Sequence, residues 1–231
     1  MAFRVATYNV HSFIGTDRRF DPERIAHVIA LLDADILAVQ ELGWHHRGRR
    51  QFDQFAWLAE TTGYHVIEAP TKFHAGAHYG NAILVREASI HHRALDLSAP
   101  FHIPRGCVIA HLAIGGRPLT AINVHLGLTP WDRSRQLRRI IAELDHIAGE
   151  TVLMGDFNSW RPDGPMFRAL RERLPHYTTV PSFHARAPHV PLDRIYVSPG
   201  LEIRRAEAPR DRVTARTSDH LPVYADIGFR R

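Results

Sequence analysis

The segment TVLMGDFNSW, residues 151–160, contains an apolar run that ends abruptly in Gly155, Asp156, Phe157 and Asn158. A short apolar run bounded by turn-forming residues is typical of a buried β-strand. In an extended chain residues i and i+2 project from the same face, so we expect Asp156 and Asn158 to point the same way, about 6–7 Å apart. This spacing leaves room for an ion or a phosphate, although a plain turn uses the same residue types.

Similar apolar runs recur along the chain and predict further strands. They cover residues 3–10, 35–41, 81–85, 107–114, 119–126, 192–197 and 221–227. Helical patterns lie between them, at 21–34, 129–149, 165–174 and, more weakly, 52–62. Strands that are apolar throughout, with helices between them, indicate sheets that are covered on both faces. We therefore expect an α/β protein with two packed sheets and helices outside them.

The two best-marked helices carry signals at their ends. In the first, Asp21 is expected to cap and Pro22 to take the first helical position. In the second, Thr129 and Asp132 form a capping-box pattern, and Gly149 is expected to end the helix. The predicted inward faces are Ile25, Val28, Ile29 and Leu32 in the first, and Leu137, Ile140, Ile141, Leu144 and Ile147 in the second.

Composition sets broad limits on the class of protein. With 231 residues, of which 45% are hydrophobic and 23% charged, the chain is expected to fold as a single domain, residues 1–231. No apolar stretch approaches the roughly 18 residues of a membrane span, and the N-terminus does not resemble a signal peptide. The single cysteine, Cys107, excludes an internal disulfide and fits a cytoplasmic protein. A net charge of +5 suits phosphate-bearing partners without selecting nucleic acid, phospholipid or small phosphoesters, and nothing indicates the oligomeric state.

Polar residues follow or precede the predicted strands at points where ligands gather in such sheets. They are Asn9, Glu41, His125, Asp156, Asn158, Asp193, Asp219 and His220. Carboxylate and amide oxygens suit a hard divalent ion such as Mg²⁺ or Mn²⁺, and the histidines and aspartates supply acid–base capacity. The sequence lacks a cysteine pair, HExxH, GxSxG and a P-loop, which argues against common zinc sites, serine hydrolases and P-loop NTPases. Together these residues point to hydrolysis of a phosphate ester.

The ordered series ATYNV, AVQE, GNAILV, INVHLGL, GDFN, LDRIYV and SDHLPV resembles the endonuclease/exonuclease/phosphatase superfamily. Its members include pancreatic DNase, exonuclease III, sphingomyelinases and inositol polyphosphate 5-phosphatases. The resemblance covers residues 5 to about 227, most closely to small bacterial members. It implies a four-layered α/β sandwich, in which two mixed β-sheets are flanked by helices, together with metal-dependent phosphoester hydrolysis.

Site roles follow from the resemblance position by position. Asn9 and Glu41 would hold the metal, with Asp219 as a further ligand or a residue that supports the ligands. The implied ion is Mg²⁺ or Mn²⁺, and the implied partner is a phosphate-ester substrate.

The remaining matched residues would act on the phosphate itself. Asp156 and Asn158 would lie against it and position or deprotonate the water. His220 would contact the phosphoryl oxygens, oriented by Asp193, and His125 would lie near the leaving group.

Weaker signals mark possible substrate contacts. Arg105 is expected either to contact a phosphate or to be a surface arginine, and Tyr79 and Asn81 to line the cleft, unless Asn81 satisfies a backbone group. His11 follows Asn9 closely and is a candidate to face the site. The run HHRGRR, residues 45–50, is either a steering element for anions or a solvated basic loop.

Two motifs differ from those of known branches of the superfamily, so the sequence does not identify the substrate. The continuation NVHSF lacks the small Asn-Gly-like step of the abasic-site repair branch, and PHVPLDRI lacks the Pro-Ala-Trp-Cys of the inositol 5-phosphatases. The first hypothesis is a phosphodiesterase or phosphomonoesterase acting on a lipid or small-molecule phosphate. The alternatives are a DNA or RNA nuclease and, third, a non-catalytic phosphate-binding module.

Overall fold

The computed structural model describes residues 2–43, 52–74, 77–88, 90–161 and 163–230. The basic run at 45–50 lies outside the described residues, so neither interpretation of it is tested. No helix in the described ranges is both long and apolar enough to cross a lipid bilayer.

Two six-stranded mixed sheets form the centre of the molecule. The first has the order β11-β12-β1-β2-β4-β3, made of β1 (Ala2–Asn9), β2 (Ile36–Leu42), β3 (His65–His74), β4 (Ala77–Val85), β11 (Leu201–Glu207) and β12 (Val223–Phe229). The second has the order β5-β6-β7-β8-β10-β9, made of β5 (His91–Asp96), β6 (Gly106–Ile114), β7 (Arg117–His125), β8 (Glu150–Asp156), β9 (His176–Tyr177) and β10 (Asp193–Val197). Each sheet contains one parallel pair, β1–β2 or β7–β8, among antiparallel neighbours.

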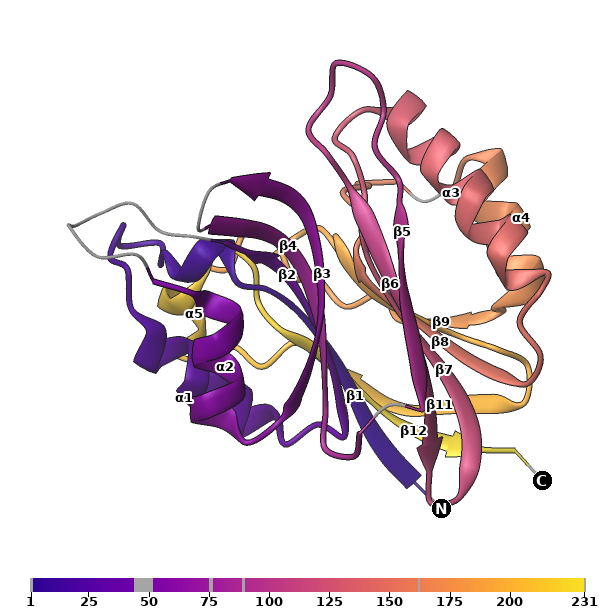
Figure 1. Cartoon of the computed structure of the whole chain (residues 1–231), viewed down its shortest axis with the longest axis horizontal. Helices are drawn as coiled ribbons and strands as arrows, with labels where there is room; N and C mark the ends of the chain where they lie inside the picture. The colour runs from indigo at the N-terminus through magenta and orange to yellow at the C-terminus, as the bar shows by residue number, and fades with distance from the viewer. Residues whose placement is uncertain (1, 44–51, 75–76, 89, 162, 231) are drawn as a thin grey trace.

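Helices cover the outer face of each sheet (Figure 1). Outside the first sheet lie α1 (Pro22–Leu32), α2 (Gln54–Thr62) and the short α5 (Thr214–Thr217); outside the second lie α3 (Pro130–Leu144) and α4 (Pro165–Arg173). A short 3-10 helix, η1 (His11–Phe13), follows β1.

Three apolar cores hold these layers together, one between the sheets and one under each group of helices. Neighbouring residues of a strand contribute to different cores. In β2, Ile36 and Ala38 pack between the sheets, whereas Leu37 and Val39 pack toward the helices. This alternation explains why the central strands are apolar throughout. The predicted four-layered α/β sandwich is therefore confirmed.

All eight predicted strands form, and four further strands were not expected. These four, β3, β5, β9 and β11, are the edge strands of the two sheets. Edge strands cover only part of a core, so their side chains are partly exposed; in β5, for example, exposed and half-buried residues alternate. A search for continuous apolar runs overlooks such strands.

The helix signals are confirmed at the N-termini but not at one C-terminus. The Asp21 side chain accepts a hydrogen bond from the Arg24 N–H, and Thr129 Oγ1 accepts one from the Asp132 N–H, each at 3.1 Å. The prediction that Gly149 ends the second helix is wrong. Helix α3 ends at Leu144, after which the His146 and Ile147 N–H groups bond to carbonyl oxygens three residues back, at 3.0 and 3.2 Å. Gly149, with φ +89°, lies in the connection to β8.

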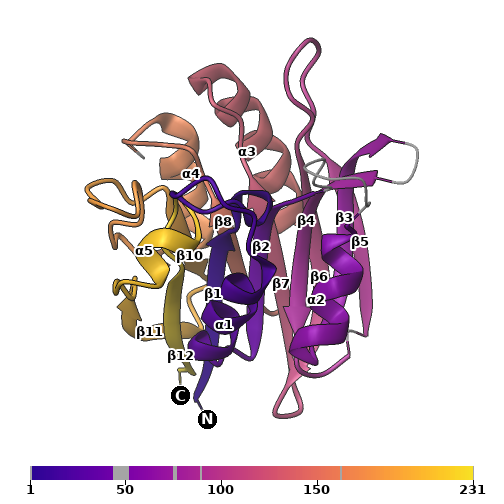
Figure 2. The ribbon, with the colours of Figure 1, turned by 90° about the vertical axis from the view of Figure 1, so that its left-hand side faces the viewer.

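The strand register brings the polar strand ends to one edge of the sandwich. Asn9 pairs with Gln40 at the ends of β1 and β2, and His125 pairs with Asp156 at the ends of β7 and β8. Asp193, at the start of β10, also pairs with Asp156. The chain ends lie at the opposite edge, where β1 and β12 run side by side (Figure 2).

A buried amide pair joins the two sheets just below this edge. Gln40 Nε2 donates to Asn123 Oδ1 at 2.7 Å, and Asn123 Nδ2 donates to the carbonyl oxygens of Val39 and Ala82 at 2.9 and 2.8 Å. Neither side chain is exposed, so every bond is made within the protein. Because buried amides need partners in fixed positions, this pair fixes how the two sheets face each other under the site.

Candidate active site

Asp156, at the end of β8, is the centre of the polar cluster and is 1% exposed. The backbone of β7 lies very close to the preceding residue, Gly155. A Cβ on Gly155 would lie 1.9 Å from the Val124 carbonyl oxygen, so only glycine fits there. Asp156 Oδ2 accepts a hydrogen bond from Asn9 Nδ2 at 3.1 Å. Burial, reinforced by the Asp193 carboxylate, raises the pKa of Asp156 to about 6 although His220 and hydrogen bonds oppose the shift.

Asn158 does not extend the strand as predicted. Its φ is +47°, and its N–H donates to Asp156 Oδ1 at 2.8 Å, which makes a side-chain turn. Asn158 Nδ2 also donates to the Leu126 carbonyl oxygen at 3.0 Å. The expectation that both side chains point the same way is therefore wrong, because β8 ends at Asp156 and the backbone is not extended at Asn158. The turn instead occupies Oδ1 and leaves Oδ2 of Asp156 directed at the other site residues.

Glu41 approaches Asp156 from the first sheet. It lies at an irregularity in the pairing of β2 with β4 and adopts a φ of +58°, an unfavourable conformation for a non-glycine residue. Asn9 Nδ2 donates to Glu41 Oε1 at 3.1 Å and to Asp156 Oδ2 at the same distance. One amide group thus stands between two carboxylates from different sheets.

His220 lies on one side of Asp156, with its Nε2 3.8 Å from Asp156 Oδ2. Its Nδ1 is 2.8 Å from Asp193 Oδ2, which also accepts a hydrogen bond from Ser182 Oγ at 2.5 Å. Burial opposes a charge on the ring, but the Asp193 and Asp156 carboxylates outweigh burial and raise the pKa of His220 to about 10. His220 is therefore an imidazolium whose second N–H is directed at Asp156.

His125 lies on the other side of Asp156, with its Nε2 3.5 Å from Asp156 Oδ2 and 3.8 Å from Glu41 Oε1. Arg105 Nη1 is 3.0 Å from His125 Nδ1. Burial, the Arg105 guanidinium and His220 hold the pKa of His125 well below its usual range, so the ring is neutral. Because a guanidinium only donates, Nδ1 must accept, and the single ring proton resides on Nε2, toward the site.

The predicted substrate contacts have different surroundings. Arg105 is 6% exposed, so the surface-arginine interpretation is wrong; its contact with His125 was not expected. Asn81 is 3% exposed and its Nδ2 donates to the Gly106 carbonyl oxygen at 3.0 Å, which favours the backbone-satisfying role over substrate binding. Burial and the nearby Glu41 carboxylate raise the pKa of Tyr79 while Arg105 opposes them, so Tyr79 lies near Glu41 and Arg105; its contact with substrate stays a prediction.

Asp219 lies at the margin of the cluster. Its Oδ1 is 3.7 Å from His11 Nδ1 and 3.3 Å from Ser218 Oγ. The single proton of Ser218 Oγ is donated to the nearer Asn9 carbonyl oxygen, at 2.8 Å. The geometry thus favours a supporting role for Asp219 over direct coordination. His11 contacts Asp219 and the Ile14 carbonyl oxygen.

Three supporting residues were missed by sequence reasoning. Ser182 lies in an irregular segment without any periodic pattern, so no signal marked it. Ser218 stands next to the predicted Asp219 and His220, and Asn123 stands two residues before His125, within quoted motifs. Their partners could not be inferred because the bonds join segments that are far apart along the chain.

The structure brings together Asn9, Glu41, His125, Asp156, Asp193 and His220. Within this group, one ligand atom each from Asp156, Asp193 and His220 lie within 4.8 Å of one another, close enough to hold one cation. The arrangement offers carboxylates, one charged and one neutral imidazole, and a hydrogen-bonded support for each ring. It is suited to bind an anion and to move a proton beside it.

Comparison with known proteins places this arrangement in a family. A UPF0294 protein of Vibrio vulnificus strain CMCP6 is 29% identical over 131 residues, which are 53% of this chain and 44% of that protein, so the chain matches less than half of this relative's length. The crystal structure of an endonuclease/exonuclease/phosphatase from Beutenbergia cavernae DSM 12333 superposes with a TM-score of 0.80, at 22% identity, over 99% of this chain and 72% of that chain. The mannosyl-6-phosphatase Bt3783 of Bacteroides thetaiotaomicron VPI-5482 superposes with a TM-score of 0.78, at 21% identity, over 98% of this chain and 100% of that chain.

These superpositions show the shared fold, and a family model settles the membership. The model of the Endonuclease/Exonuclease/phosphatase family matches residues 6–220, which include every one of the clustered residues. The chain belongs to the Endonuclease/Exonuclease/phosphatase family.

Proposed function

We propose that the chain is a divalent-metal-dependent phosphoesterase that hydrolyses a phosphodiester or phosphomonoester of a lipid or small molecule. The observation that carries this proposal is the position of Asp156. Its Oδ2 is 3.1 Å from Asn9 Nδ2, 3.5 Å from His125 Nε2 and 3.8 Å from His220 Nε2. Hydrolysis of a phosphate ester is helped by positive charge, hydrogen-bond donors and a proton acceptor at one point. Here Asp156 is the acceptor, the His220 imidazolium supplies positive charge, and Asn9 and His125 supply N–H donors.

The donor set beside Asn9 fits Mg²⁺ or Mn²⁺ better than the Asp156–Asp193–His220 group does. Hard ions prefer oxygen ligands, and Glu41 Oε1 and Asp156 Oδ2 each lie 3.1 Å from Asn9 Nδ2. If the amide turned over, Asn9 Oδ1 would take the place of Nδ2 between the two carboxylates, so that three oxygen atoms would face one ion. His220 is protonated and bound to Asp193, so it has no free lone pair for a metal. We therefore assign Asn9 and Glu41 as ligands, with Asp156 beside them and Asp219 supporting. When bound, the ion would polarise a phosphoryl oxygen and offset its negative charge.

Each remaining residue has a role that its surroundings support. His220 would donate its Nε2–H to a phosphoryl oxygen, with Asp193 holding the ring and its charge. Asp156 would accept a proton from the attacking water, since its raised pKa makes it a stronger base than an exposed aspartate. His125 would present its Nε2–H to the leaving oxygen, and Asn158 would keep Asp156 in place.

Two observations bear on the class of substrate. The superposed Bt3783 is a mannosyl-6-phosphatase, which supports a small phosphomonoester. The net charge of +5 fits any phosphate ester, including the nucleic acid of the alternative nuclease function. The whole predicted range 1–231 is proposed as one catalytic unit because the site draws on residues from Asn9 to His220. A cytoplasmic location remains a prediction from the single cysteine, Cys107.

A panel assay tests the proposal. The purified chain is incubated with Mg²⁺ or Mn²⁺ and with p-nitrophenyl phosphate, bis-p-nitrophenyl phosphate, sugar and inositol phosphates, sphingomyelin, and single- and double-stranded DNA and RNA. We expect turnover of small or lipid esters that EDTA abolishes. Turnover confined to DNA or RNA, with binding that weakens steeply with salt, would establish the nuclease instead. Phosphate binding without turnover of any ester would support the binding module.

The metal assignment has its own test. Glu41→Ala should lower activity by about 100-fold at limiting metal and recover part of it at excess metal, because a weakened site still fills at high concentration. Exposed Glu23→Ala is the matched control and should follow the wild-type metal titration. An unchanged metal dependence in Glu41→Ala contradicts the assignment.

A further inference from the structure

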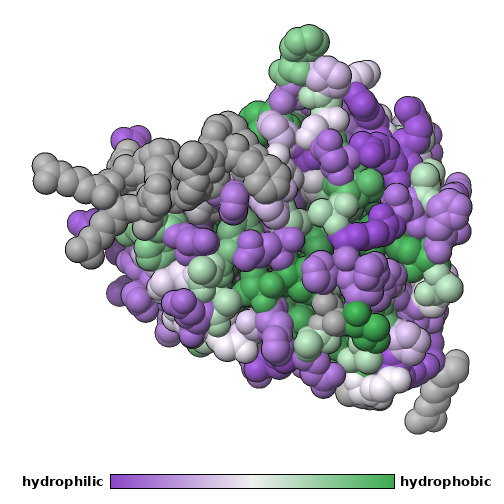
Figure 3. All heavy atoms as spheres, viewed as in Figure 1, coloured by the Kyte–Doolittle hydropathy of each residue, from purple (hydrophilic) through white to green (hydrophobic). Residues whose placement is uncertain are grey.

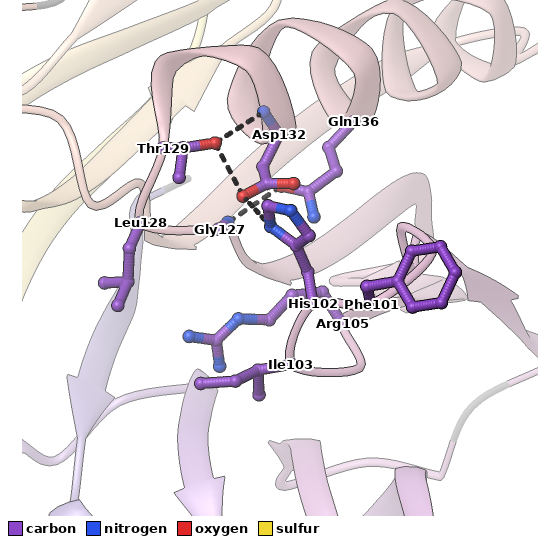
Figure 4. Close-up of a pocket in the computed structure, with 9 residues that line it drawn as sticks. All are labelled: Phe101, His102, Ile103, Arg105, Gly127, Leu128, Thr129, Asp132 and Gln136. Carbon is purple, nitrogen blue, oxygen red and sulfur yellow. Dashed lines mark hydrogen bonds and ion pairs between the residues drawn. The ribbon is translucent and has the colours of Figure 1, made fainter.

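A group of exposed apolar side chains lies beside the catalytic cluster. Seven large apolar side chains are exposed in the described part of the chain, and four of them gather here: Phe101, Ile103, Leu128 and Trp131. The first three line one cavity together with Arg105, whose Nη1 contacts His125 (Figure 4). We call the four residues the apolar rim.

The apolar rim is assembled from three separate segments. Phe101 and Ile103 belong to the loop between β5 and β6, and Leu128 follows β7. Trp131 lies in the first turn of α3, with its ring 5.9 Å from that of His102, which lines the same cavity. Figure 3 shows apolar atoms at the tip of the loop between β5 and β6. Isolated apolar residues on a surface need no explanation, but a group of four indicates an interaction surface.

Phe101 is presented to solvent by an unfavourable backbone conformation. Its φ is +64°, which is uncommon for a residue other than glycine, and its side chain is fully exposed, so no burial offsets the strain. The adjacent His102 joins the loop to α3, because its Nδ1 lies 2.8 Å from Asp132 Oδ2 (Figure 4). The loop is therefore tied to the helix while Phe101 points outward.

Helix α3 places positive charge directly behind the apolar rim. Its two acidic residues are already engaged, since Asp132 contacts His102 and Glu143 bonds to Arg93. The guanidinium carbon of Arg135 lies 5.8 Å from the centre of the Trp131 ring, so a positive charge lies against the rim. The helix carries four arginines: Arg133, Arg135, Arg138 and Arg139.

The helices outside the first sheet lack this excess of positive charge. Together α3 and α4 have seven arginines and three acidic residues, whereas α1 and α2 have one arginine and two acidic residues. The arginines are thus concentrated in the helical layer that adjoins the apolar rim. A partner of this face should offer negative charge and an apolar region together.

We propose that the apolar rim and the arginines of α3 dock on the surface of an anionic lipid bilayer. Apolar and aromatic side chains partition into the boundary between headgroups and acyl chains, where Trp is favoured, and anionic headgroups attract arginine. A nucleic acid would engage the arginines but leave Ile103 and Leu128 against a charged backbone. The inference goes beyond the proposed function, since docking requires none of the catalytic residues.

Vesicle sedimentation tests the docking. The purified chain is mixed, in EDTA, with vesicles of phosphatidylcholine alone or with about 30% phosphatidylglycerol. EDTA prevents a divalent ion from bridging carboxylates and lipid phosphates, so the protein side chains alone decide the result. We expect partitioning to be at least about tenfold stronger on the anionic vesicles and to weaken as salt screens the arginines.

Two double variants separate the apolar and the charged contributions. Phe101→Ser/Trp131→Ser should lower partitioning by at least about tenfold on both kinds of vesicle, because less apolar area is buried. Arg135→Gln/Arg138→Gln should lower it on anionic vesicles only, by roughly fivefold for each arginine.

Matched controls remove the same kinds of side chain elsewhere. Leu31→Ser/Ile90→Ser removes two other exposed apolar side chains, and Arg205→Gln/Arg230→Gln removes the same charge from β11 and the C-terminal end. Both should partition within about twofold of the wild type, since remote charges are screened. The thermal unfolding midpoint of every variant should remain near the wild-type value, because none of these side chains is buried.

Fluorescence checks which face enters the bilayer. Brominated phosphatidylcholine in the anionic vesicles should quench the emission of the wild type more strongly than that of Trp131→Phe, because Trp131 would lie among the lipids. Equal quenching of the two proteins contradicts the inference.

Three other outcomes would overturn the inference. They are absence of sedimentation with either kind of vesicle, equal losses in the control variants, and binding of single-stranded DNA without binding of vesicles. In the last case, loss of DNA binding in Arg135→Gln/Arg138→Gln would assign the surface to a nucleic acid instead.

Discussion

On one side of Asp156, His220 contacts the carboxylate of Asp193; on the other, His125 contacts the guanidinium of Arg105. Both rings are almost fully buried, and both direct Nε2 at the same oxygen, at 3.8 and 3.5 Å. Yet the pKa of His220 is raised to about 10, and that of His125 is held well below its usual range. Since burial acts on both in the same direction, the neighbour at Nδ1 decides which ring carries the charge.

This contrast provides two different donors at one carboxylate. The charged ring suits the phosphoryl oxygens, whereas the neutral ring can donate a hydrogen bond from Nε2 to the leaving oxygen while keeping its proton. The supporting residues, Asp193 and Arg105, therefore define the chemistry as much as the histidines do.

The largest expected effect comes from the residue that both histidines share. Asp156→Asn keeps the shape but removes the charge and the basicity, so we expect kcat/KM for p-nitrophenyl phosphate to fall by about 10³-fold or more. Exposed Asp163→Asn is the matched control and should retain wild-type activity. A loss of less than tenfold in Asp156→Asn would contradict the role of Asp156 as the proton acceptor.

The role of the charged histidine is tested by replacing His220 or its partner Asp193. His220→Ala should lower kcat/KM by roughly 100-fold or more. Asp193→Asn should cost about tenfold, because an orienting group is less essential than the group that it orients. Steady-state kinetics of both variants check this order, and equal losses would mean that the two roles are wrongly assigned.

The role of the neutral histidine, His125, is tested by replacing Arg105, which contacts its Nδ1. Arg105→Met leaves His125 Nδ1 without a donor, so the ring proton is no longer restricted to Nε2; we expect kcat for p-nitrophenyl phosphate to fall by about tenfold. Arg105→Gln retains an N–H donor and should lose less. Nitrogen NMR of the His125 ring should show protonation at Nδ1 in Arg105→Met alone. Identical spectra in both variants contradict the assignment.

The smallest effect is expected at Ser182, which bonds to Asp193 and so acts on His220 only indirectly. Ser182→Ala removes the donor to Asp193 Oδ2 and should reduce the free energy of unfolding by about 1–2 kcal/mol, with a few-fold loss of kcat. Urea denaturation measures the first and steady-state kinetics the second. Half-buried Ser134→Ala on α3 should change stability by less than about 0.5 kcal/mol. Equal stability changes would show that the Ser182 bond does not stabilise the fold.

The layers and strand ends were predictable because they follow from local pattern. Continuous apolar runs identified the central strands, and the polar residues directly after them converge because register brings those ends to one edge. Edge strands escaped detection because they bury too little to leave such a run.

What could not be predicted depends on contacts between distant segments and on backbone turns. Arg105 was marked as a polar residue before a strand, but its bond to His125 depends on how β6 pairs with β7. The shared direction expected for Asp156 and Asn158 was wrong because the positive φ of Asn158 is a turn geometry that the residue types permit without requiring. Ser182 reaches Asp193 from a segment without regular structure, so only coordinates reveal it.

The pairing of Ala2 with Gly228 has a consequence for rearranging the gene. The two ends of the chain are neighbours at the edge remote from Asp156, so a short linker could join them, and new termini could be opened in the exposed turn between β6 and β7 (Figure 2). Such a circular permutant would keep every catalytic neighbour in place, whereas cutting the polypeptide into two separate halves would divide Asn9 and Glu41 from Asp156 and His220.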